Sequence, residues 1–342
     1  MAYLNVSQEQ TCEKLMDILN TNIVPIDAVI TWVDGSTASH RRERAKYMAK
    51  VADPLHENAS NPHRWDNNDE ILYCLQSIEN FAPWTRKIWI VIDSEIPNLT
   101  SLSDQLQVKV NFVFHRDIFD KFSTALPTFN SLTIESMTWR IEGLSEHFMY
   151  FNDDVFLSAP LLPSDVFDGS LPVLRGKWVD YSELLYLPEK REDPAKFNHF
   201  MQINAALLAG FDAKKLFASA HVVHPIRRSI MAELFGKYRD TFLENIKYRF
   251  RDLRQFSPQS LHNHACIAAK KAIVHTEDDY IHIVSGQGIG RPQIETLELL
   301  QKASSPENKF LCINDLPQLE TVIPHVREWL HDVVGGFTAG AP

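Results

Sequence analysis

Four short apolar runs, each ending in polar residues, constrain the fold of this chain more than any other feature. They are IDAVITWVDG (26–35), IWIVID (88–93), VKVNFVFH (108–115) and HFMYFNDD (147–154). Each run is rich in β-branched and aromatic residues, which is typical of a strand buried on both faces. Helical patterns separate the runs, so the sequence predicts an α/β fold with an open, largely parallel sheet flanked by helices.

The segments around these runs complete the expected organisation. Apolar residues recur at helical spacing in 68–81, where Asn67 or Asn68 is the expected N-cap, and a second helix is expected over 131–144. The later predictions are mostly helix over 160–260, strand–turn–strand over 272–286, a last strand over 309–315 and an amphipathic C-terminal helix over 321–336. The expected divisions are a helical lead-in (1–22), an α/β core (23–160), a mostly helical region (161–260) and core-completing strands with the C-terminal helix (261–342).

Composition excludes several classes of protein. The chain has 342 residues, of which 44% are hydrophobic, enough to bury one large domain or two closely packed ones. A net charge of −10 argues against nucleic acid as a partner, because such binding needs a basic face. The four cysteines form no CxxC pair, which favours a reducing, cytoplasmic setting over a disulfide framework. No signal peptide and no run of roughly 20 apolar residues is evident.

The polar ends of the predicted strands are the candidate site, because ligands of open parallel sheets bind beyond the carboxyl ends of the strands. Asp34, Asp93, His115 and the triplet Asn152-Asp153-Asp154 occupy such ends. The side chains of two adjacent aspartates point to opposite sides in extended chain, but a turn would aim both into one cleft. Carboxylate and amide oxygens suit Mg²⁺ or Mn²⁺.

The alternative for the aspartate pair is a turn or a helix cap at the strand exit. Further acidic strand ends in the same predicted sheet, Asp34 and Asn314-Asp315, favour a metal site instead. The predicted metal ligands are therefore Asp153, Asp154, Asn314 and Asp315.

Longer segments of the chain resemble the Stealth family. They are IDAVITWVDGS, RWDNNDEILYCLQSIENFAPWTRKIWIVIDSEIP, HRDIF, LPTFNSLTIESMTWRIEGLSEHFMYFNDDVFL and FLCIND. The resemblance is dense over 26–158, weaker over 221–254 and present again at 309–315, with the blocks in the family's order. Stealth proteins are hexose-1-phosphate transferases, among them bacterial capsule polysaccharide polymerases and the animal enzyme that tags lysosomal proteins. The resemblance implies a glycosyltransferase A-like core with a mostly helical insertion.

The resemblance also implies a reaction. An acceptor hydroxyl attacks the phosphorus next to the sugar of a UDP-N-acetylhexosamine, UDP-GlcNAc or UDP-ManNAc, so that UMP leaves and a phosphodiester forms. The acceptor would be a phosphate-containing oligosaccharide, and Mg²⁺ or Mn²⁺ would assist. Such a reaction needs a positioned hydroxyl with a base, and cations around the phosphoryl oxygens.

Family precedent assigns the reacting groups. His224 in HVVHPIRR is the expected base, with His221 as competitor, since imidazole suits proton abstraction near neutral pH. Arg251 in KYRFRDLR is the expected phosphate-binding arginine and Arg249 the second choice, because a guanidinium grips two phosphate oxygens. Asp154 is expected to act beside them. The alternatives are a surface histidine and a solvated basic face.

The donor is expected to contact residues from several blocks. They are Thr31, Trp32, Asp34, Gly35, Arg64, Asn68, Asn130, Ser131 and Asn152. Trp32 has core packing as its alternative role, and Asn68 and Ser131 have helix capping.

Three further motifs indicate no function of their own. GQGIGRP lacks a P-loop lysine, HNH (262–264) lacks the context of a nuclease, and TEDDY is typical of an exposed turn. The competing functions are a conventional metal-dependent glycosyltransferase that releases UDP, a metal phosphohydrolase and a non-catalytic capsule-assembly component. The C-terminal helix is expected to pack on the core, with peripheral contact to the inner membrane face or to a capsule-assembly complex as its alternative.

Overall fold

A computed structural model describes residues 24–52, 54–61, 65, 67–275, 277–284 and 286–337. The helical lead-in expected over 1–22 and the donor residue Arg64 lie outside the described residues.

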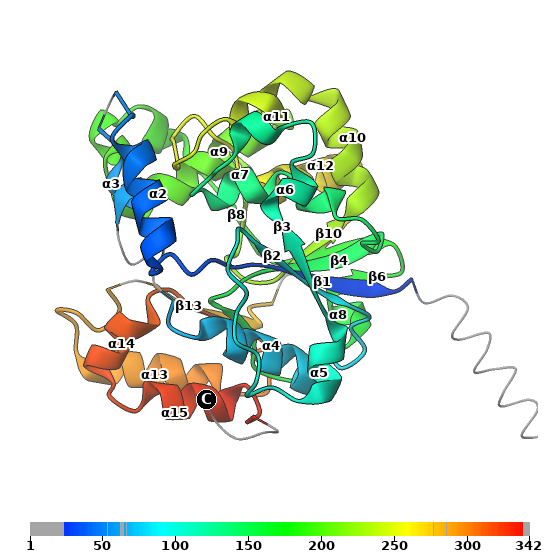
Figure 1. Ribbon diagram of the computed structural model, residues 1–342, viewed down its shortest axis with the longest axis vertical. Helices are drawn as coiled ribbons and strands as arrows, with labels where there is room; N and C mark the ends of the chain where they lie inside the picture. The colour runs from blue at the N-terminus through cyan, green and yellow to red at the C-terminus, as the bar shows by residue number, and fades with distance from the viewer. Residues whose placement is uncertain are drawn as a thin grey trace, which may run out of the picture.

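The main sheet contains all four predicted strands. Its strands are β1 (Ile26–Thr31), β2 (Ile88–Ile92), β3 (Val110–Phe114), β4 (His147–Asn152) and β10 (His224–Arg227). They lie in the order β10-β4-β1-β2-β3, with β4, β1, β2 and β3 parallel to one another and β10 antiparallel to β4. The predicted open, largely parallel α/β sheet is therefore confirmed (Figure 1).

Helices cover both faces of this sheet, because successive side chains of each buried strand point to opposite faces. On one face, Ile30 and Met149 join a core cluster with α4 (Glu70–Phe81), α5 (Asp104–Lys109), α13 (Gln293–Ala303), α14 (Leu316–Val322) and α15 (Val326–Val333). On the other, Val29 and Phe148 pack with α7 (Ser131–Glu135), α10 (Arg228–Lys237), α11 (Arg239–Ile246) and α12 (Pro258–Ala268). Figure 1 shows these two layers below and above the sheet.

The remaining elements are two longer helices, α2 and α9, and several short helices and strands. They are α2 (Ala38–Met48), α3 (Glu57–Ser60), α6 (His115–Ile118), α8 (Pro163–Val166), α9 (Phe197–Leu208), β5 (Val155–Leu157), β6 (Phe167–Asp168), β7 (Leu171–Leu174), β8 (Gly176–Val179), β9 (Leu216–Ser219), β11 (Ile273–Val274), β12 (Tyr280–Ile283) and β13 (Phe310–Ile313). Short 3₁₀ turns lie at 123–125, 138–140, 182–185, 188–191 and 194–196.

Two helix predictions differ in detail from the structure. The helix expected over 131–144 ends at Glu135, where the Ser136 hydroxyl donates to the Leu132 carbonyl and the Trp139 indole donates to the Ser136 carbonyl. Side chains that bond to nearby backbone in this way compete with helix propagation. The N-cap of α4 is Asp69, in the left-handed conformation at φ 63°, rather than Asn67 or Asn68.

The region 160–260 is only partly helical, which corrects the prediction for it. The strand pairs β6-β7 and β8-β9 interrupt it, and β10 joins the main sheet at its edge. Both strands expected within 272–286 are present, as β11 and β12, and they pair with different partners: β11 with β7 and β12 with β13.

The last predicted strand, β13, lies outside the main sheet. It forms a separate sheet in the order β12-β13-β5, so the acidic strand ends do not share one sheet as expected. β5 follows β4 directly, and Asp153 and Asp154 form the turn between them. The chain therefore passes from one sheet into the other at the aspartate pair.

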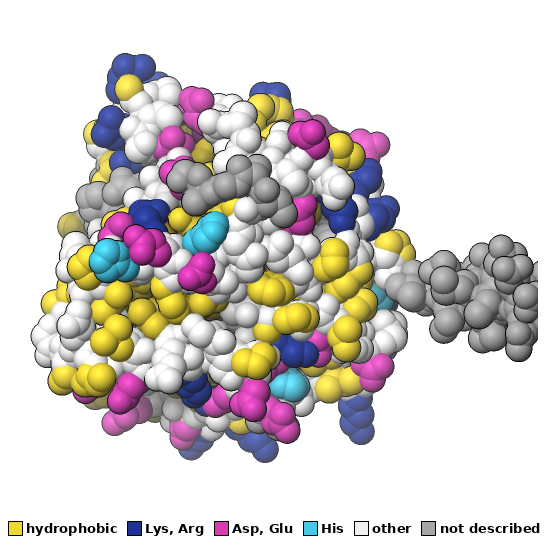
Figure 2. Space-filling model, turned by 90° about the horizontal axis from the view of Figure 1, so that it is seen from below, with side chains coloured by type: hydrophobic (Ala, Val, Ile, Leu, Met, Phe, Trp, Pro, Cys, Tyr) yellow, Lys and Arg dark blue, Asp and Glu magenta, His cyan; other side chains and the backbone are white. Residues whose placement is uncertain are grey.

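The C-terminal helix packs on the core, as one of its two predicted roles required. Val326, Leu330 and Val333 of α15 are buried in the cluster that also holds α4. The face of the molecule formed by the C-terminal helices is shown in Figure 2, where hydrophobic side chains are mixed with acidic and basic ones. No helix among the described residues is long and apolar enough to cross a bilayer.

The HNH tripeptide is part of the core rather than a surface motif. His262 and His264 on α12 are fully buried, and their Nε2 atoms accept hydrogen bonds from the backbone N–H of Arg227 (3.0 Å) and of Phe217 (3.1 Å). Nε2 of each imidazole therefore carries no proton. The two hydrogen bonds connect β10 and β9 to α12.

Stability should fall as the pH drops from about 6.5 to about 4. Burial lowers the pKa of His262 from 6.5 to about 4, so in this window the unfolded chain binds a proton that the folded chain does not. His262 makes its full contribution to the free energy of unfolding above pH 6.5 and loses it by pH 4. That contribution is at most about 3 kcal/mol. Urea titrations of the wild-type protein and of His262→Gln, from pH 7.5 to pH 4, measure it. The variant should show a shallower decline, and parallel curves would contradict the prediction.

Candidate active site

The site lies where the two sheets meet. The Ile313 N–H donates to the Asp154 carbonyl at 3.0 Å, so the end of β13 lies beside the turn that carries Asp153 and Asp154. The sheet-to-sheet connection thus brings together the two acidic segments that the sequence analysis selected, 153–154 and 314–315.

Asp154 is held by a chain of hydrogen bonds from the second sheet. The Asn314 side-chain amide donates to Asp154 Oδ2 at 2.7 Å, and Asn314 Oδ1 lies 2.6 Å from Nε2 of His282 on β12. The other carboxylate oxygen, Asp154 Oδ1, is buried and has no hydrogen-bond partner among the described residues. A buried carboxylate oxygen of this kind needs a ligand, since an unpaired one is costly.

Three carboxylates crowd together at this point. Burial, followed by the charges of Asp154 and Glu70, raises the pKa of Asp153 well above its usual range. Burial, followed by Asp154, raises the pKa of Glu70 to about 7. A nearby cation would favour the ionised forms of Asp153 and Glu70, and carboxylate oxygens are ligands that divalent cations accept.

The other two predicted metal ligands are engaged elsewhere. Asn314 uses its amide to orient Asp154, and its oxygen lies against His282. Asp315 has φ 63° and caps α14, where its Oδ1 accepts from the Gln318 N–H at 3.4 Å. Asn314 therefore contacts Asp154 directly, whereas Asp315 caps a helix.

Tyr150 joins the ends of β1 and β4. Its hydroxyl lies 2.8 Å from Thr31 Oγ1 and accepts from the Asn152 side-chain amide at 3.1 Å. Thr31 and Asn152 are direct partners in the parallel register. Trp32, in contrast, is buried in the core cluster with 5% exposure, which is the alternative role foreseen for it.

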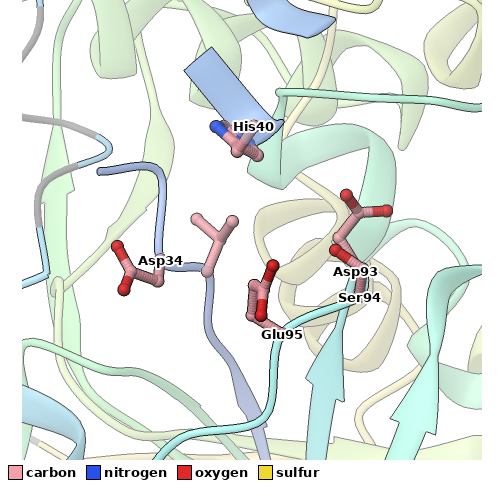
Figure 3. Close-up of a pocket in the computed structure, with 6 residues that line it drawn as sticks. Asp34, His40, Asp93, Ser94 and Glu95 are labelled. Atoms are coloured by element: carbon pink, nitrogen blue, oxygen red, sulfur yellow. The ribbon is translucent and has the colours of Figure 1, made fainter. Parts of the chain in front are cut away.

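A small pocket opens at the carboxyl ends of β1 and β2. Its lining residues are Val33, Asp34, His40, Asp93, Ser94 and Glu95. Figure 3 shows Asp34 and His40 from the β1 side of this pocket, and Asp93, Ser94 and Glu95 from the end of β2.

Two neutral histidines accompany these carboxylates. His115 is buried, with Nδ1 3.6 Å from Asp93 Oδ1, and burial followed by His40 lowers its pKa to about 4. Burial also lowers the pKa of His40, whose Nδ1 has no hydrogen-bond partner within the described part of the chain. The pocket therefore offers carboxylate acceptors together with the uncharged imidazole of His40, and His115 is buried behind Asp93.

Gly35 is required by close packing. A Cβ at this position would lie 2.3 Å from the Trp65 Cβ and 2.4 Å from its carbonyl oxygen. The Trp65 indole donates to the Phe129 carbonyl at 3.4 Å, so the loop after β1 packs against the segment that precedes α7. Any larger residue at 35 would displace these two segments.

Arg251 is bonded to two polar side chains near the start of α7 and on α3. It donates to Ser131 Oγ at 2.7 Å and to Asn58 Oδ1 at 3.3 Å. Burial lowers its pKa, while Glu135, Tyr150 and Asp154 oppose that shift.

Arg249 is occupied differently. It donates to the carbonyls of Thr124 (2.9 Å) and Leu126 (3.1 Å), and its guanidinium carbon lies 4.9 Å from the centre of the Tyr47 ring. The two arginines therefore differ in surroundings although they are two residues apart.

His224 lies at the start of β10, directly opposite Tyr150 of β4. The two rings are stacked with centroids 6.5 Å apart. Burial, then His221 and His262, lower the pKa of His224 to about 3, so the imidazole is uncharged at neutral pH.

The remaining predicted donor residues have local bonds. Asn130 caps α7 through Leu132 N–H (3.2 Å) and donates to the Tyr248 carbonyl at 2.9 Å, which fixes the loop that carries Arg251. Asn68 is partly exposed, and its N–H donates to Glu70 Oε2 at 3.2 Å.

Sequence reasoning missed four residues of this region: Glu70, Tyr150, His282 and Cys312. Glu70 was available as an acidic residue in the first turn of a predicted helix. Tyr150 lies inside an apolar strand, where nothing distinguishes it from core. His282 and Cys312 became relevant only through the pairing of β12 with β13.

This arrangement defines a class of protein: an α/β domain with a cluster of carboxylates at its strand ends and an arginine and a neutral histidine beside it. The chain belongs to the Stealth family. Residues 24–52 match Stealth protein CR1, conserved region 1, and residues 64–172 match Stealth protein CR2, conserved region 2.

Curated relatives carry related names. An exopolysaccharide phosphotransferase of Streptomyces coelicolor is 32% identical over 88% of this chain and 48% of its own length. The capsular polysaccharide phosphotransferase fcs1 of Haemophilus influenzae is 27% identical over 91% of this chain and 83% of its own. The chain thus spans about half the length of the Streptomyces relative.

Among solved structures, the galactosyltransferase LgtC aligns with 92% of this chain and 97% of its own at 11% identity. The TM-score is 0.44, a level of similarity from which no conclusion about this chain follows.

Proposed function

We propose that this chain transfers an N-acetylhexosamine 1-phosphate, most simply GlcNAc 1-phosphate, from a UDP-sugar to a hydroxyl of a growing, phosphate-containing capsular glycan. UMP is released and a phosphodiester forms. One observation carries the proposal: in a Stealth protein, the Asp153–Asp154 turn, His224 and Arg251 all surround the Tyr150 end of β4. The names of the relatives, capsular and exopolysaccharide phosphotransferases, support the same class of product.

The nucleoside of the donor is assigned to the pocket at the ends of β1 and β2. The hydroxyl groups and the ring N–H of uridine need acceptors, which the carboxylates of Asp34 and Asp93 supply. The neutral imidazole of His40 adds a donor without adding charge.

The cation is assigned to Asp153 and Asp154. When bound there, Mg²⁺ or Mn²⁺ would neutralise charge on the pyrophosphate of the donor. The unpaired Asp154 Oδ1 and the crowding of three carboxylates support this assignment.

The reacting groups are assigned to His224 and Arg251. The neutral imidazole of His224 accepts the proton of the acceptor hydroxyl as its oxygen bonds to the phosphorus next to the sugar. The bond from that phosphorus to the UMP oxygen breaks, and UMP takes the electron pair. Arg251 binds the phosphoryl oxygens and stabilises their charge. The bond between the sugar and its phosphate stays intact.

The proposed location is the cytoplasm, with peripheral contact to the membrane face where the glycan is assembled. Cys74, Cys266 and Cys312 are free and buried, which suits a reducing compartment.

The nucleotide released is the decisive test. With UDP-GlcNAc and an oligosaccharide acceptor, chromatography should show UMP formed in proportion to product, and NMR of the product should show phosphorus coupled to carbons of both sugars. Asp154→Asn should yield neither, since it removes a cation ligand. Release of UDP would instead indicate a conventional glycosyltransferase. UMP formed equally fast without acceptor would indicate a phosphohydrolase.

A further inference from the structure

Three side chains from distant parts of the sequence meet beside the aspartate pair. Asp154, His221 in the connection between β9 and β10, and Cys312 on β13 each offer one ligand atom, and these atoms lie within 4.8 Å of one another. Such a mutual spacing is compatible with a single metal ion, which holds nitrogen ligands at about 2.0–2.1 Å and thiolate sulfur at about 2.3 Å.

We propose that His221 is a ligand of the divalent cation together with Asp154, and that this nitrogen makes the site prefer a transition metal such as Mn²⁺ or Co²⁺ over Mg²⁺. The inference rests on the proposed function because both concern the cation assigned to Asp154. Imidazole nitrogen is a poor ligand for Mg²⁺ and a good one for later divalent metals, whose affinity rises from Mn²⁺ to Co²⁺.

The surroundings of Asp154 prepare one oxygen for this role. Its Oδ2 is fixed by the Asn314 amide, whereas its Oδ1 is buried without a hydrogen-bond partner in the described structure. The bonded oxygen sets the orientation of the carboxylate, and the other remains for a ligand. Metal-binding carboxylates are commonly oriented by hydrogen bonds of this kind.

His221 is oriented by the same network. Its ring lies 5.3 Å from that of His282, centroid to centroid, at an angle of 57°. His282 in turn contacts Asn314 at 2.6 Å. One chain of contacts, His221–His282–Asn314–Asp154, therefore determines the position of both ligands.

Cys312 lies beside Asp154 and His221. It is fully buried, and its Sγ lies 3.6 Å from the Asn314 amide. Its sulfur is the third potential ligand atom of the cluster, beside those of Asp154 and His221.

The two histidines of HVVHPIRR then have separate roles. His221 lies with Asp154 and His282, whereas His224, three residues further along, stacks on Tyr150. This arrangement assigns the cation to the first histidine and the acceptor proton to the second.

Metal binding to the full chain without nucleotide tests the inference. Calorimetry should give a higher affinity for Co²⁺ than for Mg²⁺. His221→Ala should weaken Co²⁺ and Mn²⁺ binding about 10–100-fold, the range seen when the surroundings of metal ligands are altered, and Mg²⁺ binding less. His224→Ala is the matched control and should bind all three ions like the wild-type protein.

Pulsed electron paramagnetic resonance of bound Mn²⁺ gives a second readout. A coupling to imidazole nitrogen should be present in the wild-type protein and in His224→Ala, and absent from His221→Ala. A wild-type spectrum without that coupling, or unchanged Co²⁺ affinity in His221→Ala, would overturn the inference. If the wild-type protein releases UMP but His221→Ala keeps its Co²⁺ affinity, this inference alone is refuted. If the wild-type protein binds Mn²⁺ with the nitrogen coupling but transfers no sugar phosphate, the proposed function alone is refuted.

Discussion

Replacing His224 with glutamine is expected to slow sugar-phosphate transfer about 10²–10⁴-fold, the usual contribution of a general base. Glutamine keeps the size of the side chain and a hydrogen-bonding group, but it cannot take up the proton of the acceptor hydroxyl. His224 faces Tyr150 rather than the pocket assigned to the nucleoside, so donor binding should be retained. Steady-state kinetics with varied UDP-sugar should therefore show a lower kcat and little change in KM.

The His224→Gln experiment has its own checks. Thermal unfolding of the variant should resemble that of the wild-type protein, because glutamine is of similar size and keeps a polar group at this position. A variant that retains nearly full kcat would exclude His224 as the base and return that role to His221, the competitor within the same segment.

Arg251→Lys is expected to lower the transfer rate about 10²–10³-fold, as loss of a preorganised charge-stabilising donor does in other enzymes. Lysine keeps the positive charge that balances Glu135 and Asp154, yet it lacks the planar fork that binds two phosphate oxygens. The substitution also removes the fixed orientation that Ser131 and Asn58 give to the guanidinium. The effect should appear in kcat, measured as UMP release at saturating donor.

Arg249→Lys is the matched comparison for Arg251→Lys. Arg249 donates to the carbonyls of Thr124 and Leu126, so its replacement should affect loop stability more than the transfer rate. If Arg249→Lys proves the more damaging of the two for transfer, the assignment of the phosphate-binding arginine must be reversed.

The parallel strands could be predicted because burial on both faces leaves a continuous apolar run in the sequence. The strand β10 could not, since HPIR is four residues long, carries no alternation and contains Pro225. Proline is tolerated there because β10 lies at the edge of the sheet. The prediction of mostly helix for 160–260 failed for the same reason: strands of two to four residues leave little pattern to read.

The site was predictable to the extent that it depends on strand ends. Asp34, Asp93 and the aspartate pair were found because polar residues follow apolar runs, and in the structure they do lie at the strand ends. The contact of Asn314 with Asp154 joins residues 160 positions apart, and it depends on β13 pairing with β5. Periodicity does not reveal which strands pair, so the meeting of two sheets at Asp154 emerged only from the structure.

The antiparallel edge strand fixes a distance across the main sheet. β10 and β1 lie on either side of β4, and neighbouring strands are about 4.8 Å apart, so roughly 10 Å separates the strand that carries His224 from the strand that carries Thr31. Backbone hydrogen bonds set this span, so substitutions in the loops around the strand ends should leave the separation of the two strands unchanged.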